Sequence, residues 1–241
     1  MSISRPAFYT LPAGSWRSYV NLLHPPYTAW HLSYVGLGWA LTPETHWERL
    51  GGTLIAFFLA VGISAHAIDE LKGRPLKTGI PAPVLSVLAS LSLGGAIAIG
   101  IVGIFTITPW LLPFVIVGPI LVVAYNGEML QGRLHNTLWF SLGWGAFPVL
   151  TAYFANAETL TPQVFLVAGG AFGITSAQRT LSRWVRLIRR EVLEVHGSLT
   201  LENSTPRQLE KKDLIRATEA SLWLLSLSMP LLAVGLVLAK L

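Results

Sequence analysis

Long apolar stretches recur along this chain, and each is close to the length that a helix needs to cross a lipid bilayer, about 20 residues. Seven candidate spans cover about residues 29–41, 47–70, 83–107, 110–130 and 137–156, a run from 162 past 176, and 222 to the C-terminus. Lipid offers no partners to exposed backbone groups, so these runs are expected to be helical. The sequence therefore predicts an all-α, polytopic membrane helix bundle of about seven transmembrane helices, forming a single integral membrane domain over residues 1–241.

Composition supports a membrane protein. Charged residues make up 12% of the chain and hydrophobic residues 52%, whereas a soluble domain carries roughly twice that charged fraction. A soluble fold of this composition would expose large apolar patches, which soluble monomers rarely do. The chain has no cysteine, which excludes disulfides and thiolate metal sites. The first residues lack the apolar core and cleavage site of a signal peptide, so no cleavage is expected.

Basic residues gather on one side of the predicted membrane. Of the 17 lysines and arginines, all but Arg49 and Lys240, that is 15, fall in the N-terminal segment or in the even-numbered gaps between spans. The positive-inside rule places this side in the cytoplasm. We therefore expect an integral protein of a cytoplasmic-type membrane, with its N-terminus in the cytoplasm and its C-terminus outside.

The longest polar insertion is a basic segment at about residues 178–216, on the predicted cytoplasmic side. Its first half, residues 179–195, alternates five arginines with apolar residues and predicts an amphipathic helix that continues the sixth span. Such a helix can anchor at anionic lipid headgroups, or it can contact a phosphate-bearing ligand directly. The sequence leaves both interpretations open.

Three clusters of polar residues lie near the predicted cytoplasmic ends of the spans, where ionisable groups are costly and often functional. The first cluster surrounds the start of span one and contains His24, Tyr27, His31 and Tyr34. A single histidine in an apolar run is usually a hydrogen-bonded core residue. The second histidine and the two tyrosines favour a site.

The second cluster ends span two. His66 and Glu70 are four residues apart and share a helical face, which Asp69 flanks. An imidazole with carboxylates can bind a metal ion, and the bases that follow, Arg74 and Lys77, can bind phosphate. The alternative is a helix end with ordinary juxtamembrane charge.

The third cluster lies between spans four and five. Its members are Tyr125, Asn126, Glu128, Arg133 and His135. The parity of the spans puts it on the same side of the membrane as the second cluster, so we expect the two to face one another across the bundle.

The order of these elements resembles the UbiA superfamily of intramembrane prenyltransferases. The run Ala65-His66-Ala67-Ile68-Asp69 is similar to the aspartate-rich motif that ends the second helix in that family, and residues 74–79, Arg-Pro-Leu-Lys-Thr-Gly, follow it as an Arg-Pro follows the family motif. The resemblance covers roughly residues 25–190. It implies a helical bundle with a cytoplasmic-facing cavity, in which magnesium held by aspartates binds a prenyl diphosphate.

The chain departs from the family pattern at three points. His66 stands where an aspartate is expected, and about seven spans are predicted instead of nine. The second aspartate motif is missing, and Gln178, Arg179 and Arg183 occupy its neighbourhood.

The resemblance implies a UbiA-like transferase that acts on a prenyl or other lipid diphosphate, with a membrane lipid or isoprenoid as its partner and no nucleic acid. A divalent cation, magnesium first, would be held by Asp69, Glu70 and Glu128, with His66 beside them. The substrate would be bound by Arg74, Lys77, Tyr125, Asn126, Arg133, Arg179 and Arg183.

Two other functions are compatible with the same residues. His24, His31, His66 and His135 with Glu70 and Glu128 form a mixed imidazole and carboxylate set that suits iron, zinc or copper better than magnesium. That set would indicate a transition-metal-dependent membrane enzyme. Alternatively, the cavity binds an isoprenoid, quinone or pigment without catalysis, or the chain is a subunit of a larger complex.

Overall fold

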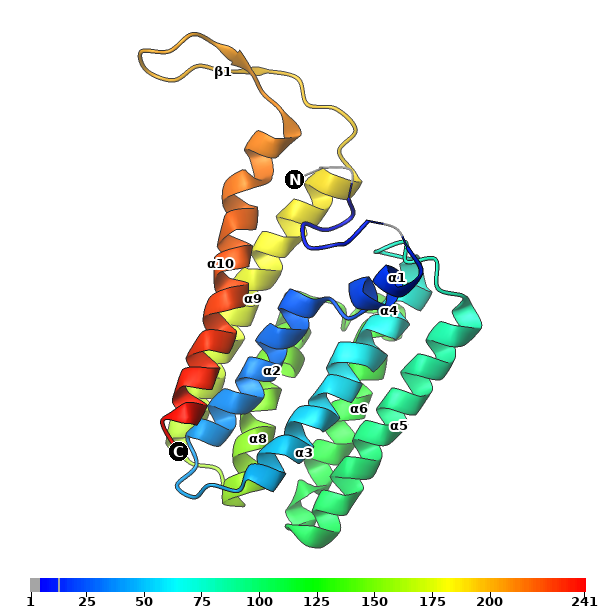
Figure 1. Cartoon of the computed structure of the whole chain (residues 1–241), viewed down its shortest axis with the longest axis vertical. Coiled ribbons are helices and arrows are strands. Elements are labelled where there is room, and N and C mark those ends of the chain that lie inside the picture. The colour runs from blue at the N-terminus through cyan, green and yellow to red at the C-terminus, as the bar shows by residue number, and fades with distance from the viewer. Residues whose placement is uncertain (1–4, 13) are drawn as a thin grey trace.

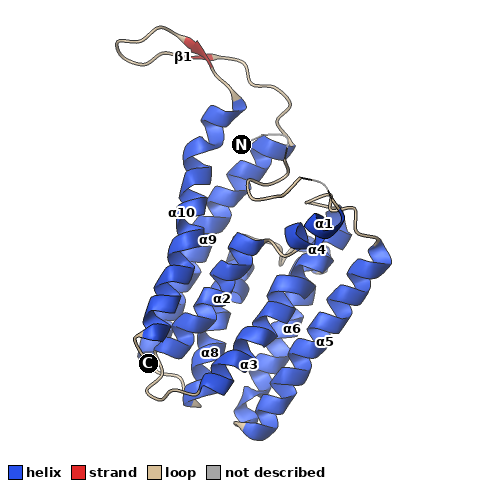
Figure 2. Cartoon of the chain, in the orientation of Figure 1, coloured by secondary structure: helices blue, strands red, loops and turns tan. Residues whose placement is uncertain are grey.

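The computed structural model describes residues 5–12 and 14–241, so residues 1–4 and 13 of the predicted single domain lie outside the described part. The chain is 74% helical, and its long helices run side by side as a bundle (Figures 1 and 2). The helices are α1 Ser15–Leu22, α2 Pro25–Ala40, α3 Trp47–Phe57, η1 Phe58–Ala65, α4 His66–Gly73, α5 Ala82–Thr106, η2 Pro109–Leu111, α6 Leu112–Asn126, η3 Leu130–Gly132, α7 Thr137–Ser141, η4 Leu142–Ala146, α8 Phe147–Ala157, α9 Pro162–Arg190 and α10 Lys211–Leu238.

Five of these helical stretches are long and apolar enough to cross a membrane, which supports the predicted all-α membrane bundle. They are Trp47–Gly73, Ala82–Thr106, Pro109–Asn126, Thr137–Ala157 and Lys211–Leu238. The other two predicted spans also form helices. However, α2 has 16 residues, fewer than the roughly 20 that span a bilayer, and α9 carries a basic C-terminal half.

Two stretches of π-helix interrupt the predicted spans. η1 separates α3 from α4, and η4 separates α7 from α8. π-helical turns are rare and often occur at functional sites. η1 ends directly before His66, and η4 includes Trp144. Both residues line the site described below.

The largest apolar core lies between α2, α8, α9 and α10. Trp30, Tyr34 and Val149 are almost completely buried in it. The polar atoms of this core are paired: the Trp30 indole N–H donates to the Tyr34 hydroxyl at 2.7 Å, and the Thr175 hydroxyl is hydrogen-bonded to the same oxygen at 2.9 Å. α2 packs closely on α8 at Gly38, because a Cβ there would lie 2.3 Å from the Val149 carbonyl oxygen.

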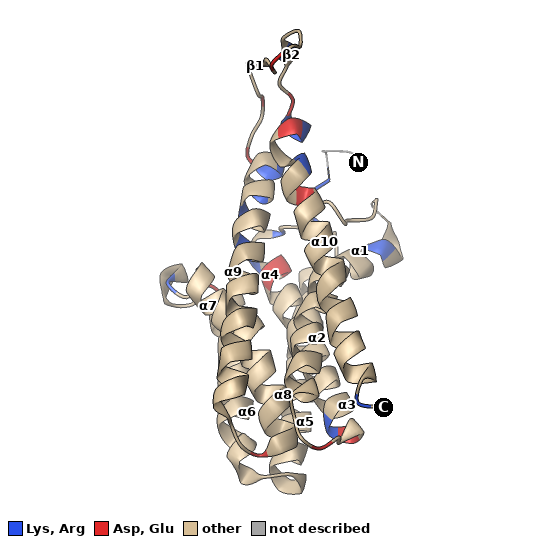
Figure 3. Ribbon diagram, turned by 90° about the vertical axis from the view of Figure 1, so that its left-hand side faces the viewer, with Lys and Arg blue, Asp and Glu red and all other residues tan. Residues whose placement is uncertain are grey.

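Charge is concentrated at one end of the bundle, on α1, α4 and the upper parts of α9 and α10 (Figure 3). We call this end, where α4 ends at Gly73 and α9 ends at Arg190, the basic end. At the opposite end, Arg49 pairs with Glu158 at 3.0 Å, and Lys240 binds the backbone carbonyl oxygen of Thr42. The predicted asymmetry of charge is therefore present in the fold.

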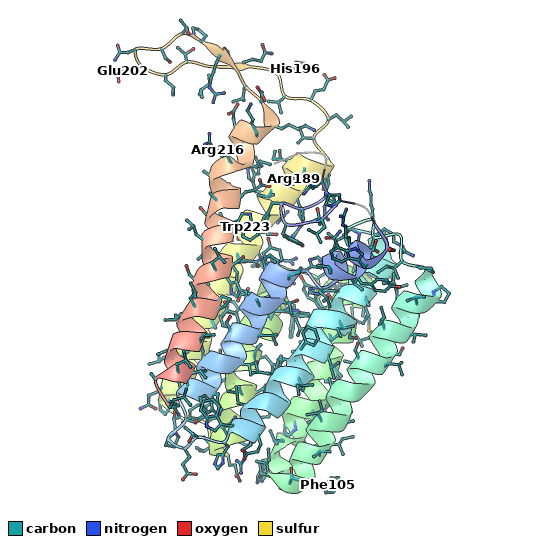
Figure 4. The ribbon with its side chains drawn as sticks, in the orientation of Figure 1. Phe105, Arg189, His196, Glu202, Arg216 and Trp223 are labelled. Carbon is teal, nitrogen blue, oxygen red and sulfur yellow. The ribbon has the colours of Figure 1, made fainter. Side chains whose placement is uncertain are left out.

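α9 and α10 extend beyond the other helices at the basic end and are joined by a loop with two short antiparallel strands, β1 Ser198–Leu199 and β2 Arg207–Gln208 (Figure 1). Inside the helix pair, Arg189 forms an ion pair with Glu219 at 2.5 Å and donates to the Arg5 carbonyl oxygen at 3.2 Å. Arg189 and Trp223 lie on the part of the pair nearest the N-terminal segment (Figure 4). Phe8 of that segment packs there against Ile215 and Leu222.

Candidate functional site

The basic end contains a polar cavity of about 280 Å³, bounded by α2, α4, α6, α9 and the N-terminal segment. All three polar clusters predicted from the sequence contribute to its wall. The predicted residues that line it are His24, Tyr27, His31, His66, Asp69, Tyr125, Asn126, Glu128, His135 and Arg179. The expected convergence of the second and third clusters is therefore seen in the structure, and the first cluster joins them.

The remaining predicted residues do not line this cavity. Arg74 donates to the Ile80 carbonyl oxygen at 2.5 Å, and Lys77, Arg133 and Arg183 are exposed elsewhere on the surface.

Glu70 also lies outside the cavity, and its hydrogen bonds define its structural role. It is 1% exposed, and its carboxylate accepts hydrogen bonds from the Leu76 N–H at 3.0 Å, the Thr78 N–H at 2.8 Å and the Thr78 hydroxyl at 2.9 Å. The carboxylate therefore holds the loop after α4 against the helix. This role accounts for an acidic residue at a helix C-terminus, where the helix dipole disfavours negative charge.

Replacing Glu70 by Ala is expected to destabilise the protein by about 3 kcal/mol, because it leaves buried donors of the loop without an acceptor, and hydrogen bonds to a charged group are worth about 1.5–3 kcal/mol each. Thermal unfolding of the purified protein in detergent measures the effect. Glu128→Ala is the control, since Glu128 is exposed at the cavity mouth. An equal and small shift in both variants would contradict the structural role.

Three arginines of α9 form one wall of the cavity: Arg179, Arg186 and Arg190. Arg179 donates to the Tyr125 hydroxyl, and at 3.4 Å to the His135 carbonyl oxygen. Arg186 donates to the Ser182 hydroxyl at 2.8 Å and Arg190 to the Pro6 carbonyl oxygen at 3.3 Å.

None of these partners is charged. In the described part of the chain no carboxylate lies within ion-pairing distance of any of the three arginines. Buried or partly buried charges are usually paired, so this wall is suited to an anionic ligand.

The sequence reasoning named Arg179 but missed Arg186 and Arg190. The signal was available, because positions 179, 186 and 190 follow the helical spacing of i, i+7 and i+11 and so share a face. Arg183, four residues after Arg179, follows the same spacing, but it is exposed and does not line the cavity, so spacing alone does not separate it from the other three. Tyr9, which also lines the cavity, lies outside any periodic segment and gave no comparable signal.

Two histidines of the cavity wall stack on one another: His24, directly before α2, and His66, the first residue of α4. The rings of His24 and His66 lie 4.2 Å apart and nearly parallel, and the Tyr9 hydroxyl is 2.6 Å from Nδ1 of His24. Burial, and next the neighbouring His66 imidazole, lower the pKa of His24 well below its usual range. Burial also raises the pKa of Tyr9 well above its usual range. Both groups are therefore neutral near pH 7.

Three histidines of the cavity are oriented by backbone carbonyl groups. The Nδ1 atoms of His31, His66 and His135 lie 2.9, 3.1 and 3.2 Å from the carbonyl oxygens of Trp144, Gly62 and Tyr125, in that order. A carbonyl oxygen can only accept, so each Nδ1 carries the proton and donates. In the neutral imidazole the lone pair is then on Nε2, the nitrogen that can take a proton.

The cavity does not fit the metal ions that the sequence analysis expected. Asp69 and Glu128 are the carboxylates that line it, and Glu70, the third predicted ligand, is occupied by the loop. Within residues 5–12 and 14–241, no group of three or more histidine, aspartate and glutamate side chains is placed to share one ion. The carboxylate set for magnesium and the mixed set for iron or zinc are therefore not assembled here.

A second, largely apolar cavity of about 390 Å³ lies between α3, η1, α5, α6 and α8. Its wall is formed mainly by apolar side chains and glycines, among them Phe57, Ala96, Gly100 and Phe147, and it also includes Glu48 and Arg49 at the end opposite to the basic end. Trp144 lines both cavities. An amphipathic molecule could thus place a polar head at the basic end and an apolar chain inside the bundle.

Comparisons with protein-family models, with curated proteins and with solved structures find no match for this chain. The chemistry of the two cavities is therefore argued from their own residues.

Proposed function

We propose that this protein is an intramembrane transferase, UbiA-like in its organisation, that acts on a prenyl or other lipid diphosphate. The observation that carries the proposal is the arginine wall of the polar cavity, formed by Arg179, Arg186 and Arg190 without a carboxylate partner in the described residues. The apolar cavity, which shares Trp144 with the polar one as a lining residue, supplies room for the lipid chain. An anionic head next to an apolar chain is the chemical form of a lipid diphosphate.

The arginine wall binds the diphosphate. A guanidinium group keeps its charge throughout the physiological range and donates two parallel hydrogen bonds to a phosphate group. When the bond between the lipid carbon and the diphosphate oxygen breaks, negative charge grows on the leaving group. Donors fixed in position next to that oxygen stabilise this charge. In this proposal the arginines take the part that metal ions take in the family the sequence resembles.

The apolar cavity binds the chain. Each methylene group moved from water into an apolar site contributes about 0.8 kcal/mol, but a chain already in the bilayer gains little of this, because lipid is equally apolar. The cavity therefore selects the length and shape of the chain more than it adds affinity. Phe57, Phe114 and Phe147 provide aromatic faces along its wall.

The membrane orientation forms part of the proposal. α2 and α9 act as two further spans beside the five apolar stretches, giving the seven spans expected from the sequence. The basic end then faces the cytoplasm, where soluble diphosphates are found and where the positive-inside rule puts arginine and lysine. The site opens to that side, past the N-terminal segment.

The proposal is tested by ligand binding to the purified full chain in lipid nanodiscs. Tritiated farnesyl diphosphate is expected to bind, and unlabelled farnesol is expected to compete at least about 100-fold less well, since it lacks the charged head. Binding is expected to survive EDTA, because the arginines supply the positive charge. Equal competition by farnesol, or complete loss of binding in EDTA with recovery in magnesium, would contradict this function or its metal-free form respectively.

A further inference from the structure

Two hydrogen-bond acceptors in the α2 and α9 part of the polar cavity wall have no donor among the described residues. Oε1 of Gln178, on α9, is buried without a partner, and no hydrogen bond is found to Nε2 of His31, on α2. Each of the two residues is 4% exposed. Nearly all buried polar atoms in folded proteins are paired, so the unpaired oxygen of Gln178 indicates a missing donor, and Nε2 of His31 is free to accept from a bound molecule.

The orientation of His31 makes its free nitrogen a proton acceptor. Nδ1 donates to the Trp144 carbonyl oxygen at 2.9 Å, so the lone pair of the neutral ring lies on Nε2. Within residues 5–12 and 14–241, no donor to Nε2 is found. Trp144 belongs to the π-helical stretch η4, and its carbonyl oxygen thereby fixes the imidazole ring in position.

Gln178 lies next to the same part of α2. Tyr27, one helical turn before His31, interacts through its hydroxyl with Ser182 at 3.4 Å and with the Gln178 side chain. Gln178 and Ser182 are themselves one turn apart on α9. The amide oxygen of Gln178 remains buried without a partner.

This part of the cavity wall is adjacent to the arginine wall. The Arg179 guanidinium carbon lies 5.1 Å from the centre of the Phe140 ring, and Phe140 contacts the His31 ring edge-on at 5.8 Å. Phe140 also stacks on Trp144 at 5.5 Å. A group bound at His31 therefore lies one aromatic ring away from the proposed diphosphate site, and next to Trp144, which lines both cavities.

We infer that His31 and Gln178 form the binding site for the second substrate, an uncharged molecule with two hydroxyl groups, of which one donates to Nε2 of His31 and the other to Oε1 of Gln178, and that His31 is the general base for the first hydroxyl. This inference rests on the proposed function. The first hydroxyl donates its proton toward Nε2 of His31. An acceptor molecule with an apolar ring or chain fits beside Phe140 and Trp144.

The transfer step balances without any further reactant. The oxygen of the first hydroxyl forms a bond to the first carbon of the lipid chain, and the bond from that carbon to the diphosphate oxygen breaks. The diphosphate leaves with the electron pair, next to the arginines. The hydroxyl proton moves to Nε2 of His31, and the product is an ether with inorganic diphosphate.

The other two oriented histidines are less suited to this role. His66 stacks on His24, and His135 stacks on Tyr125 at 4.5 Å, a tyrosine whose hydroxyl accepts from Arg179. His31 is the imidazole that reaches the Trp144 carbonyl group, and Trp144 is shared with the apolar cavity. Of the three oriented histidines, His31 is therefore the one next to the residue that lines both cavities.

The decisive variant is His31→Asn. The Asn amide N–H can replace Nδ1 as a donor to Trp144, but no atom replaces Nε2. With tritiated farnesyl diphosphate and 4-nonylphenol as probes, the wild type is expected to form the ether, and 4-nonylanisole, the methyl ether of that phenol, is expected to give no product. H31N is expected to bind farnesyl diphosphate as the wild type does and to lose about 100-fold or more in transfer, the usual contribution of a general base. Transfer at wild-type rates by H31N would overturn the assignment.

Gln178→Leu keeps the inference testable if H31N does not fold. This variant is expected to raise the KM for 4-nonylcatechol about tenfold or more, because the hydrogen bond that the second hydroxyl donates to Oε1 of Gln178 is lost, while the Kd of farnesyl diphosphate stays unchanged. An unchanged KM would contradict the role of Gln178.

Failure of the proposed function gives a different result. If farnesyl diphosphate does not bind at all, the lipid diphosphate proposal fails, and the hydroxyl site is tested alone. In that test the wild type is expected to bind 4-nonylphenol more tightly than 4-nonylanisole, and H31N is expected to lose the difference. If farnesyl diphosphate binds and no ether forms, the general-base assignment is overturned while the diphosphate site stands.

Discussion

Replacing Arg186 by Gln is expected to weaken the binding of farnesyl diphosphate by about 10- to 100-fold. Hydrogen bonds to a charged group contribute about 1.5–3 kcal/mol, and 1.4 kcal/mol corresponds to a tenfold change in Kd. Arg186 is half-buried in the cavity wall, where water screens it less than it would an exposed base, and it donates to Ser182 without an acidic partner. Equilibrium binding of the tritiated lipid in nanodiscs measures the loss.

The matched control is Arg183→Gln. Arg183 lies on the same helix, three residues earlier, and is exposed outside the cavity. Both variants lower the net charge by the same amount, so any general attraction of the basic end for anions falls equally in the two. A similar loss of affinity in R183Q and R186Q would mean that surface charge, and not a site built by α9, attracts the diphosphate.

A double variant, in which Arg179 and Arg186 are both replaced by Gln, tests whether the two arginines bind the same diphosphate. Arg179 and Arg186 line the same cavity, and Arg179 also bonds to the Tyr125 hydroxyl. If both guanidinium groups contact one diphosphate, their effects are coupled and the double variant deviates from the sum of the single losses. Independent, additive effects would place the two arginines on separate ligands or on none.

Much of the fold follows from the pattern of apolar runs and charge. The span expected at 83–107 is α5, Ala82–Thr106, and the span expected at 137–156 is the helical stretch Thr137–Ala157. The first of these helices begins after Pro81 and the second after Asn136, whose side chain caps it, and both have the length that a bilayer requires. The start of the first helix was placed at about residue 29, whereas α2 begins at Pro25, because proline is well suited to the first turn of a helix.

The π-helical stretches could not be predicted in the same way. η1 and η4 consist mostly of apolar residues and glycine, a composition that α-helical spans share, and no residue type is diagnostic of a π-turn. They arise from packing between neighbouring helices: in η4, a Cβ on Gly145 would lie 2.8 Å from the Ala171 carbonyl oxygen of α9. The orientation of His31 by Trp144 depends on this stretch, so it too lay beyond sequence reasoning.

The sequence predicts which types of residue form the candidate site, but not every residue that lines it. Helical spacing correctly placed His66 and Asp69 on the cavity side of α4. The same spacing suggested Glu70, whose carboxylate instead accepts from the loop that folds back after Gly73. The loop folds back because the backbone is left-handed at Arg74, Lys77 and Gly79. The pattern of charges and apolar spans in the sequence does not indicate this conformation.

Replacing Ala96 by Phe is expected to exclude long lipid chains while short ones still bind. Ala96 lies on α5 and lines the apolar cavity, so the added ring occupies space that the chain needs. A long chain that enters the narrowed cavity clashes with the added ring, and overpacking of this kind costs about 1–3 kcal/mol. Affinity for geranylgeranyl diphosphate is therefore expected to fall by up to about 100-fold, and affinity for dimethylallyl diphosphate is expected to stay within about twofold of the wild type.

Ala98→Phe is the control for this change, because Ala98 lies two residues along the same helix and is exposed on the outer surface of the bundle. The added ring there meets lipid and leaves the cavity unchanged. The ratio of the two dissociation constants, long chain over short chain, is the informative quantity, because a general disturbance of α5 changes both. A ratio that rises in A96F and not in A98F would locate the chain in the apolar cavity. An unchanged ratio in both variants would place the chain outside the bundle, in the bilayer, with only its head held at the basic end.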